Sequence, residues 1–194
     1  MTIAKQSVNT KQTIRLAAEK LFRERGYAAV GLREIAKAVG IEAPSIYNHY
    51  KSKDDILREI CFDMAKQFFI AFDKAVETED KNLKKLKAVI VAHIQVIATN
   101  MEAAEVFFHE WVFLEQPHLS KFKKLRHEYE MKFRQIIDAG IKRGDFKKMN
   151  SKLTAFAIFS ALNATYELYH TNEKLTPEQI TTDISDLLLK GLKA

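Results

Sequence analysis

The fold of this chain can be worked out from residues 32–57, which read LREIAKAVGIEAPSIYNHYKSKDDIL. Apolar residues recur at helical spacing at its start, at Leu32, Ile35, Ala36 and Val39. Gly40 follows directly and is expected to stop that helix. A second short helix is expected to begin near Glu42 or Ala43, because Pro44 suits a first helical turn, where its missing N–H costs nothing. Two short helices joined by a tight turn predict a helix-turn-helix.

The second short helix carries small side chains where a recognition helix would face DNA. A helix-turn-helix places its second helix in the major groove. We therefore expect three residues to approach base edges, namely Ala43, Ser45 and Asn48. Asparagine can pair with adenine, and serine can bond several bases. Donors that suit phosphate oxygens flank this helix, namely Tyr47, His49, Lys51 and Lys53. In an isolated pair of helices, however, ordinary exposed turn residues would look the same.

The distribution of charge indicates a polyanionic partner for the first part of the chain. Residues 1–53 hold ten Lys and Arg against four Glu, a balance of +6, while the rest of the chain holds 21 basic and 21 acidic residues. A basic segment attached to a neutral body indicates that the first part meets nucleic acid and the second does not. A solvated basic helix surface would give the same balance.

The whole chain is expected to be all-α. Three prolines and six glycines interrupt 194 residues, and 47% hydrophobic with 29% charged residues is ordinary for a globular protein. Outside the two short helices, helical spacing of apolar residues predicts helices over 10–25, 53–76, 83–99, 102–114, 118–143, 153–170 and 176–191. The total is about nine helices. Capping boxes are expected at two helix starts, Ser52 with Asp55 and Thr176 with Gln179.

Several classes of function are disfavoured by what the sequence lacks. A lone cysteine, Cys61, permits no internal disulfide, and neither a signal peptide nor a membrane span is recognisable, so we expect a cytoplasmic protein without membrane insertion. There is no GxSxG, P-loop or GxGxxG signature, and enzyme activity is not expected. Without an HExxH pair or a cysteine cluster, neither a metal site nor a cofactor is expected.

The same stretch, LREIAKAVGIEAPSIYNHYKSKDDIL, closely resembles the DNA-binding motif of the TetR family of bacterial regulators. LFRERGY, at residues 21–27, matches the same family, so the resemblance covers roughly Thr10 to Leu57. It implies DNA contacts from Arg33, Ser45, Tyr47, Asn48, His49 and Lys53. It also implies a core for the motif formed by Ile35, Ala36, Val39, Ile41, Ile46 and Tyr50.

Two residues depart from the family pattern. Gly31 stands where the family usually has a threonine that caps the helix and touches phosphate, so that contact is expected to reduce to a backbone N–H. Glu42 replaces a common serine at the start of the recognition helix. Its charge suits the helix dipole but repels nearby phosphates. The operator sequence therefore cannot be copied from a relative.

The resemblance implies a helix-turn-helix domain over residues 1–53 and a ligand-binding and dimerisation domain, a helical bundle, over residues 54–194. A homodimer is expected because one short helix reads few base pairs, whereas two can read a palindromic operator. The helices expected over 153–170 and 176–191 are the candidate interface, with Phe156, Ser160, Ala164, Ile184, Leu187 and Leu188. The alternative is that these helices complete the core of one monomer.

The resemblance also implies a ligand pocket in the body, and aromatic residues there are candidates to line an elongated apolar cavity. We expect it to be lined by Phe68, Phe72, His93, Ile97, Phe108, Trp111, Asn163 and Tyr166. The polar groups of Asn163 and Tyr166 could orient a ligand headgroup. A solid aromatic core would give the same pattern.

Three segments of the C-terminal half, IDAGIKRGDFK, SALNATYELYH and KLTPEQITTDISDLLLKGL, resemble TetR-type regulators of fatty-acid and steroid breakdown that respond to acyl-CoA thioesters. The phosphates could meet Lys121, Lys123, Lys124 and Arg126, although a solvated basic helix face would look the same. We therefore predict a homodimeric repressor that binds double-stranded DNA and is released by a small hydrophobic effector such as an acyl-CoA. Two alternatives stay open: a structural DNA-binding protein that recruits a protein partner, and a helical-bundle enzyme.

Overall fold

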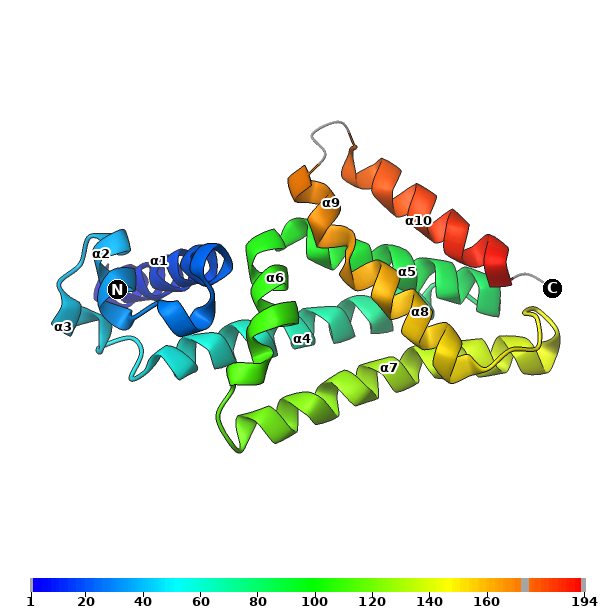
Figure 1. Ribbon diagram of the computed structural model, residues 1–194, viewed down its shortest axis with the longest axis horizontal. Coiled ribbons are helices and arrows are strands. Elements are labelled where there is room, and N and C mark those ends of the chain that lie inside the picture. The colour runs from blue at the N-terminus through cyan, green and yellow to red at the C-terminus, as the bar shows by residue number, and fades with distance from the viewer. Residues whose placement is uncertain (1, 172–174, 193–194) are drawn as a thin grey trace. The chain divides into compact units, whose positions relative to one another are not determined.

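The computed structural model describes residues 2–171 and 175–192, and within them it contains ten α-helices, two short 3-10 helices and no strand (Figure 1). The predicted all-α class is confirmed. The chain packs into two compact units. Unit 1 consists of Met1–Met64 and Glu102–Phe122, and unit 2 of Ala65–Met101 and Lys123–Ala194. The predicted domain boundary at residue 53 stays a prediction.

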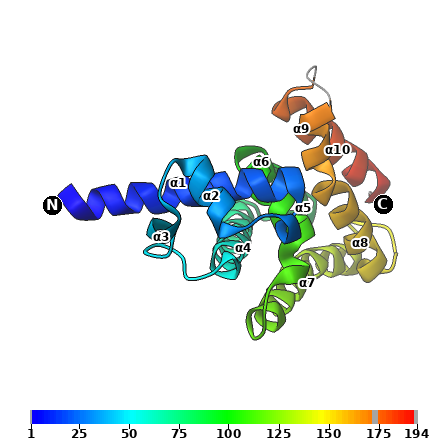
Figure 2. The same ribbon diagram turned by 60° about the vertical axis from the view of Figure 1, so that its left-hand side comes forward.

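Unit 1 contains the helix-turn-helix and the helices that support it. Its first elements are α1 (Thr2–Arg25), η1 (Tyr27–Ala29), α2 (Leu32–Val39) and α3 (Ala43–Ile46). It also takes in the beginnings of α4 (Lys53–Glu77) and α7 (His118–Arg143), with α6 (Met101–His109) and η2 (Glu110–Phe113). Helix α2 packs against α1 and α3 (Figure 2).

The core of unit 1 matches the expected motif. Four of the six residues expected in it are buried, namely Ile35, Ala36, Ile46 and Tyr50. Val39 and Ile41 are half-buried. The core continues into α1 through Ile14 and Phe22 and into α4 through Leu57, and none of these three side chains is exposed to solvent. The helix-turn-helix is therefore fixed to longer helices on both sides of it in the sequence.

The turn between α2 and α3 depends on Gly40. Its φ of 74° and ψ of 29° lie in the left-handed region, where a residue with a Cβ is disfavoured. The Gly40 N–H bonds the carbonyls at the end of α2, and the Ile41 N–H donates to the Ala36 oxygen at 3.0 Å. The predicted glycine stop is confirmed.

Helix α4 begins with the predicted capping box. The Asp55 N–H donates to Ser52 Oγ at 3.1 Å, and the Ser52 N–H donates to Asp55 Oδ2 at 3.2 Å. Asp55 also accepts from the Lys51 N–H. This reciprocal bonding satisfies donors that a helix start leaves open, and it fixes where the chain leaves the recognition segment and enters α4.

Unit 2 is a helical bundle. It contains the remainders of α4 and α7 with α5 (Asn82–Thr99), α8 (Ser151–Asn163), α9 (Thr165–Thr171) and α10 (Pro177–Leu192). Helix α5 packs against α8, α9 and α10. The Thr176 and Gln179 capping box at the start of α10 is confirmed by both of its hydrogen bonds.

Helix boundaries differ from the sequence prediction at three places. Helix α1 begins at Thr2 rather than near residue 10, and the helix expected over 102–114 ends at His109 and is followed by η2. A single helix was expected over residues 153–170, but the chain forms α8 and α9 with a break at Ala164. The hydroxyl of Thr165 donates to the Leu162 carbonyl at 2.7 Å, so it satisfies part of the backbone opened by the break. Continuous apolar spacing could not reveal this, because Ser and Thr side chains compete locally with helical backbone bonds.

The end of α7 is packed tightly against the loop that follows. A Cβ added to Gly140 would lie 2.2 Å from the ring carbons of Phe146, so only glycine lets this ring pack on the helix. The N–H groups of Asp145 and Phe146 both donate to the Gly140 carbonyl. Asn82 on α5 donates to Asp145 Oδ2 at 2.9 Å. The loop therefore joins the ends of α5 and α7.

Candidate functional site

The residues expected to contact DNA lie together in the helix-turn-helix of unit 1. Arg33, Tyr47 and Asn48 are exposed, and Tyr47 keeps 54% of its surface open to solvent. The remaining four are partly exposed, namely Ala43, Ser45, His49 and Lys53. Exposed planar and amide side chains beside a short helix are the groups that major-groove readers present to bases and phosphates.

The recognition segment is a short helix that continues as a turn. Helix α3 ends at Ile46, and the N–H groups of Tyr47, Asn48 and His49 then each bond the carbonyl three residues earlier. This turn has the tighter spacing of a 3-10 helix. It therefore displays Tyr47 and Asn48 next to each other on exposed backbone of defined geometry.

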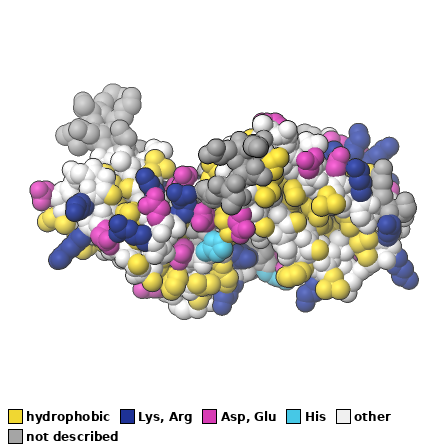
Figure 3. Space-filling view, turned by 45° about the horizontal axis from the view of Figure 1, so that its top comes forward, with side chains coloured by type: hydrophobic (Ala, Val, Ile, Leu, Met, Phe, Trp, Pro, Cys, Tyr) yellow, Lys and Arg dark blue, Asp and Glu magenta, His cyan; other side chains and the backbone are white. Residues whose placement is uncertain are grey.

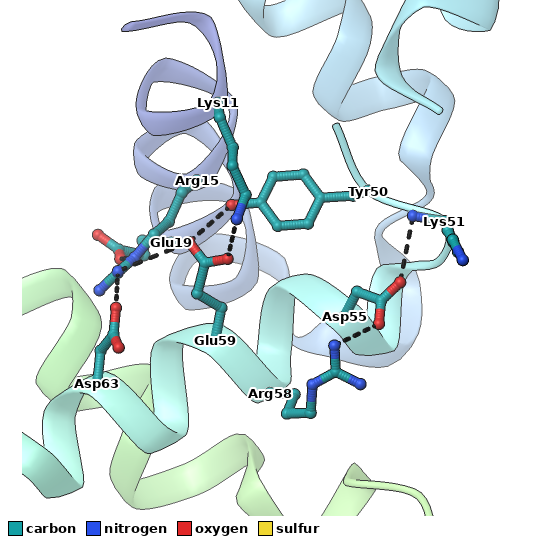
Figure 4. Close-up of polar contacts among 9 residues, drawn as sticks. All are labelled: Lys11, Arg15, Glu19, Tyr50, Lys51, Asp55, Arg58, Glu59 and Asp63. Atoms are coloured by element: carbon teal, nitrogen blue, oxygen red, sulfur yellow. Dashed lines mark hydrogen bonds and ion pairs between the residues drawn. The ribbon is translucent and has the colours of Figure 1, made fainter. Parts of the chain in front are cut away.

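A network of polar side chains holds α1 on α4 behind the recognition segment (Figure 4). The hydroxyl of Tyr50 donates to Glu59 Oε1 at 3.0 Å, and the ammonium of Lys11 lies 2.6 Å from Glu59 Oε2. Burial, and then the charge of Glu59, raise the pKa of Tyr50, so its hydroxyl keeps the proton that it donates. Tyr50 thus fixes the C-terminal end of the recognition segment to α4.

A second ion pair strengthens the same packing. Arg15 on α1 bonds Glu19 at 2.8 Å and also pairs with Asp63 on α4. Burial raises the pKa of Glu19, and the guanidinium of Arg15 opposes that rise. Because the glutamate is 5% exposed, the arginine supplies the compensation that a buried carboxylate requires.

Lys53 has an internal role that the sequence did not reveal. Its ammonium donates to the Tyr27 carbonyl at 2.6 Å and lies 4.1 Å from the centre of the Tyr27 ring. That ring stacks on Phe113 of η2 with centroids 5.4 Å apart. Burial lowers the pKa of Lys53. In this conformation the lysine stabilises η1, and its contact with a DNA phosphate stays a prediction.

The backbone N–H at Gly31 is already bonded. It donates to Glu34 Oε2 at 2.9 Å, and the other oxygen of Glu34 pairs with Arg25 at 2.7 Å. The sequence reading assigned that N–H to a phosphate. In the structure the glutamate carboxylate occupies the place where the phosphate would accept this bond.

Unit 2 contains a cluster of aromatic rings around one histidine. The His93 ring stacks on Phe68 at 4.5 Å between centroids and lies 5.9 Å from Tyr129, with Phe133 and Phe159 on other sides. His93 Nδ1 and the Tyr129 hydroxyl are 3.2 Å apart. Burial lowers the pKa of His93 to about 3, and the Asn163 amide opposes the shift, so the ring is neutral at physiological pH.

The residues expected to line a ligand pocket are divided between the units. Unit 2 contains Phe68, Phe72, His93, Ile97, Asn163 and Tyr166, all buried except Asn163, which is half-buried. Unit 1 contains Phe108 and Trp111, and the Trp111 ring lies 5.9 Å from Phe122. Sequence reasoning missed Tyr129, Phe133 and Phe159. Their positions on the apolar faces of α7 and α8 were the available signal.

The residues expected at a dimer interface include large exposed apolar side chains on α8 and α10. Phe156 and Leu187 are each 70% exposed, and Leu153 is 67% exposed. Ser160 and Ala164 are exposed, whereas Ile184 and Leu188 are half-buried. On the face drawn in Figure 3, hydrophobic side chains reach the surface among charged ones. Whether these residues meet a second copy stays a prediction.

Within residues 2–171 and 175–192, no helix is long and apolar enough to cross a membrane. In the same ranges, no group of three or more His, Cys, Asp or Glu side chains is placed to hold a metal ion.

Comparison of the sequence with families and curated relatives gives consistent matches. The profile described as "Bacterial regulatory proteins, tetR family" matches residues 14–60, and "Tetracyclin repressor-like, C-terminal domain" matches residues 79–192. The HTH-type transcriptional repressor KstR2 of Mycolicibacterium smegmatis is 23% identical over 96% of this chain and 92% of its own length. The Fatty acid metabolism regulator protein of Bacillus subtilis is 26% identical over 91% and 92%.

Solved structures share the fold over nearly the whole chain. The ketosteroid transcriptional regulator KstR2 of Mycobacterium tuberculosis superposes with a TM-score of 0.90 at 22% identity, covering 95% of each chain. AibR, solved with isovaleryl coenzyme A and operator DNA, gives 0.82 at 19% identity and covers 93% of this chain and 98% of its own. With both parts of the chain matched by the family profiles, this protein belongs to the TetR family of bacterial transcriptional regulators, which are not enzymes.

Proposed function

We propose that this chain represses transcription by binding a palindromic operator as a homodimer, and that a small hydrophobic effector releases it. The observation that carries the proposal is the recognition segment. Arg33, Tyr47 and Asn48 are exposed there, while Tyr50 and Lys11 are fixed to Glu59 behind it. A recognition segment held this firmly loses little conformational entropy when it binds DNA, and this favours specific recognition of bases.

The exposed apolar side chains of α8 and α10 support the homodimer. Phe156 and Leu187 are each 70% exposed, which is costly for large apolar groups unless another surface covers them. Two helices on each copy would form an interface of two-fold symmetry. A symmetric dimer places two recognition helices about 34–36 Å apart, one helical turn of DNA, and therefore reads a palindrome.

Two kinds of relative support a hydrophobic effector, with acyl-CoA thioesters as the first class to test. One relative is named for fatty-acid metabolism, and AibR was solved with isovaleryl coenzyme A. The aromatic cluster of unit 2 offers apolar surroundings for an acyl chain, and the part of α7 in the same unit offers two lysines for the phosphates, Lys123 and Lys124. Such an effector and genomic DNA would place the protein in the cytoplasm.

Selection of tight-binding duplexes from a random DNA pool tests the proposal. We expect a palindrome to be enriched, and titration of the winners at several salt concentrations should show strong salt dependence from phosphate contacts. Addition of acyl-CoA thioesters to the complex should then release the DNA, because the effector and the operator favour different conformers.

One variant tests the dimer in this experiment, and a second variant is its control. Phe156→Glu on α8 should leave unit 1 folded but give monomers in sedimentation and lose the palindrome. Lys20→Ala, which removes an exposed charge of α1, should change neither result. Binding with no enriched sequence would contradict the operator, and a ligand that binds without altering operator affinity would contradict effector control.

A further inference from the structure

His93 is a buried polar group that is only half satisfied. It is 3% exposed, and its Nδ1 lies 3.2 Å from the Tyr129 hydroxyl. Its Nε2 is buried and has no hydrogen-bond partner among the residues that the structure describes. A buried donor or acceptor left unpaired destabilises the folded protein, because it has lost its bonds to water. Such groups are exceptions in folded proteins, and each calls for a specific explanation.

The proton of the neutral imidazole can be assigned from its neighbour. Burial raises the pKa of Tyr129, so the phenol keeps its proton and can donate it. If Tyr129 donates to Nδ1, the histidine proton sits on Nε2. The Nε2–H is then the one group of the His93–Tyr129 pair that has no partner. The opposite arrangement would leave the Tyr129 proton and the Nε2 lone pair both unsatisfied. The first arrangement is therefore favoured, with an N–H at Nε2 that lacks an acceptor.

Apart from the Asn163 amide and the Tyr129 hydroxyl, the surroundings of the His93 ring are apolar and uncharged. The rings of Phe68, Phe133 and Phe159 pack around His93 with centroid distances of 4.5 to 6.5 Å. Lys132 is paired with the carboxylate of Asp73 at 2.6 Å and is thereby neutralised. A carboxylate or phosphate next to His93 would lose its hydration without gaining a free cation. A neutral acceptor fits there better than an anion.

The break between α8 and α9 lies at the same place. Asn163, the last residue of α8, interacts with the His93 ring through its amide, yet it does not form a well-aligned hydrogen bond to Nε2. Ala164 stands between the two helices, and Thr165 bonds back to Leu162. Asn163 therefore lies at the end of α8 with its amide beside the His93 ring.

We propose that His93 is the hydrogen-bonding anchor of the effector, and that its Nε2–H donates to a neutral carbonyl oxygen on an otherwise apolar group, such as an acyl chain or a ring ketone. The inference rests on the proposed function, because it specifies the chemistry of the effector that releases the operator. Every side chain that it uses lies in unit 2. Asn163 assists by turning its amide toward the same oxygen.

Pairs of probes that differ in the carbonyl alone test this anchor in the wild-type protein. Palmitoyl-CoA is compared with its thioether analogue hexadecyl-CoA, octanoyl-CoA with octyl-CoA, and 1-decalone with decalin, each by titration calorimetry. Because the unpaired donor gains an acceptor only from the carbonyl, we expect the better-fitting carbonyl probe to bind about tenfold more tightly than its partner.

Two substitutions at the same position separate hydrogen bonding from packing. His93→Phe keeps an aromatic ring and removes the donor. It should therefore erase the difference in affinity between the two probes of each pair, while the affinity for the probe without a carbonyl stays unchanged. His93→Gln places an amide N–H near the position of Nε2 and should restore part of the difference. Thermal melting of both variants confirms that they fold.

Each outcome decides the proposal. Equal binding within every pair would overturn it, because a buried water would then be satisfying Nε2. No binding of any carbonyl probe would also overturn it, and so would an undiminished difference in His93→Phe, because a group other than His93 would then be recognising the carbonyl. Operator release is measured separately on the same complexes. If carbonyl probes bind through His93 but the DNA stays bound, the anchor stands and the proposed effector control fails. If a ligand releases DNA without using His93, the reverse holds.

Discussion

A polar network in unit 1 and a buried histidine in unit 2 differ in how far their hydrogen bonds are satisfied. In unit 1, Tyr50, Lys11 and Glu59 satisfy one another, as do Arg15 and Glu19. In unit 2, His93 is surrounded by aromatic rings with one nitrogen unpaired within the described part of the chain. Satisfied networks stiffen a structure, whereas an unsatisfied buried group favours a state in which something completes it. We therefore expect a rigid recognition segment in unit 1 and, under the proposal above, a histidine in unit 2 whose free nitrogen a ligand completes.

The largest expected effect comes from the tight packing of unit 2. Gly140→Ala places a Cβ 2.2 Å from the Phe146 ring, so the buried ring must move and the end of α7 separates from its loop. We expect a loss of about 3 kcal/mol in the free energy of unfolding, measured by urea denaturation. Hydrogen exchange should locate the loss in unit 2.

Gly191→Ala is the matched control, because a Cβ there meets nothing within 4 Å. It should stabilise α10 by about 0.5–1 kcal/mol, since alanine loses less chain entropy than glycine in a helix. An equal loss of amide protection in unit 1 after Gly140→Ala would break the comparison, because the units would then unfold as one.

The second effect tests the network of unit 1. Glu59→Leu leaves the buried Tyr50 hydroxyl without its acceptor and Lys11 without its carboxylate, and should cost about 2 kcal/mol of unfolding free energy. Affinity for every DNA sequence should fall as the recognition segment loses its support. Lys20→Leu, an exposed change on α1, should do neither. Unchanged stability in Glu59→Leu would mean that packing alone holds α1 on α4.

The third effect separates base reading from phosphate binding. Asn48→Ala should weaken binding to the selected operator by about 1–2 kcal/mol and relax discrimination at one position of each half-site. Lys51→Ala should instead weaken all sequences alike and lower the salt dependence. Fluorescence anisotropy with single-base variants of the operator measures both. If Asn48→Ala lowers the affinity equally for the operator and for every single-base variant of it, Asn48 does not read a base.

The effect that is smallest near neutral pH concerns acid stability. Burial lowers the pKa of His93 to about 3 from the ordinary value of 6.5, so below 6.5 the unfolded chain binds a proton that the folded chain refuses. The contribution of the neutral His93 to the free energy of unfolding is therefore fully present above pH 6.5 and is lost as pH falls toward 3. The slope of the unfolding free energy from this group is at most about 1.4 kcal/mol per pH unit.

His93→Phe and His93→Gln should each remove that part of the slope, measured by urea unfolding at a series of pH values below 6.5. Tyr50, whose partner is the Glu59 carboxylate, serves for comparison, because Tyr50→Phe should leave this slope in place. The same acid sensitivity in wild type and in both His93 variants would show that the folded protein admits the proton.

The sequence by itself determined the all-α class, the helix-turn-helix and most helix bounds, because these depend on local spacing. The stop at Gly40 and the capping boxes at Ser52 and Thr176 involve residues within one or two turns of each other. The exposed positions of Tyr47 and Asn48 followed from the same spacing.

Tertiary structure alone decided which distant side chains meet. The pairing of Lys11 with Glu59, the bond from Lys53 to the Tyr27 carbonyl and the contact of His93 with Tyr129 join residues 26 to 48 positions apart. The break at Ala164 was equally hidden. Such contacts depend on how helices pack, and the energies that select them come from burial and desolvation, which no local pattern of residues encodes.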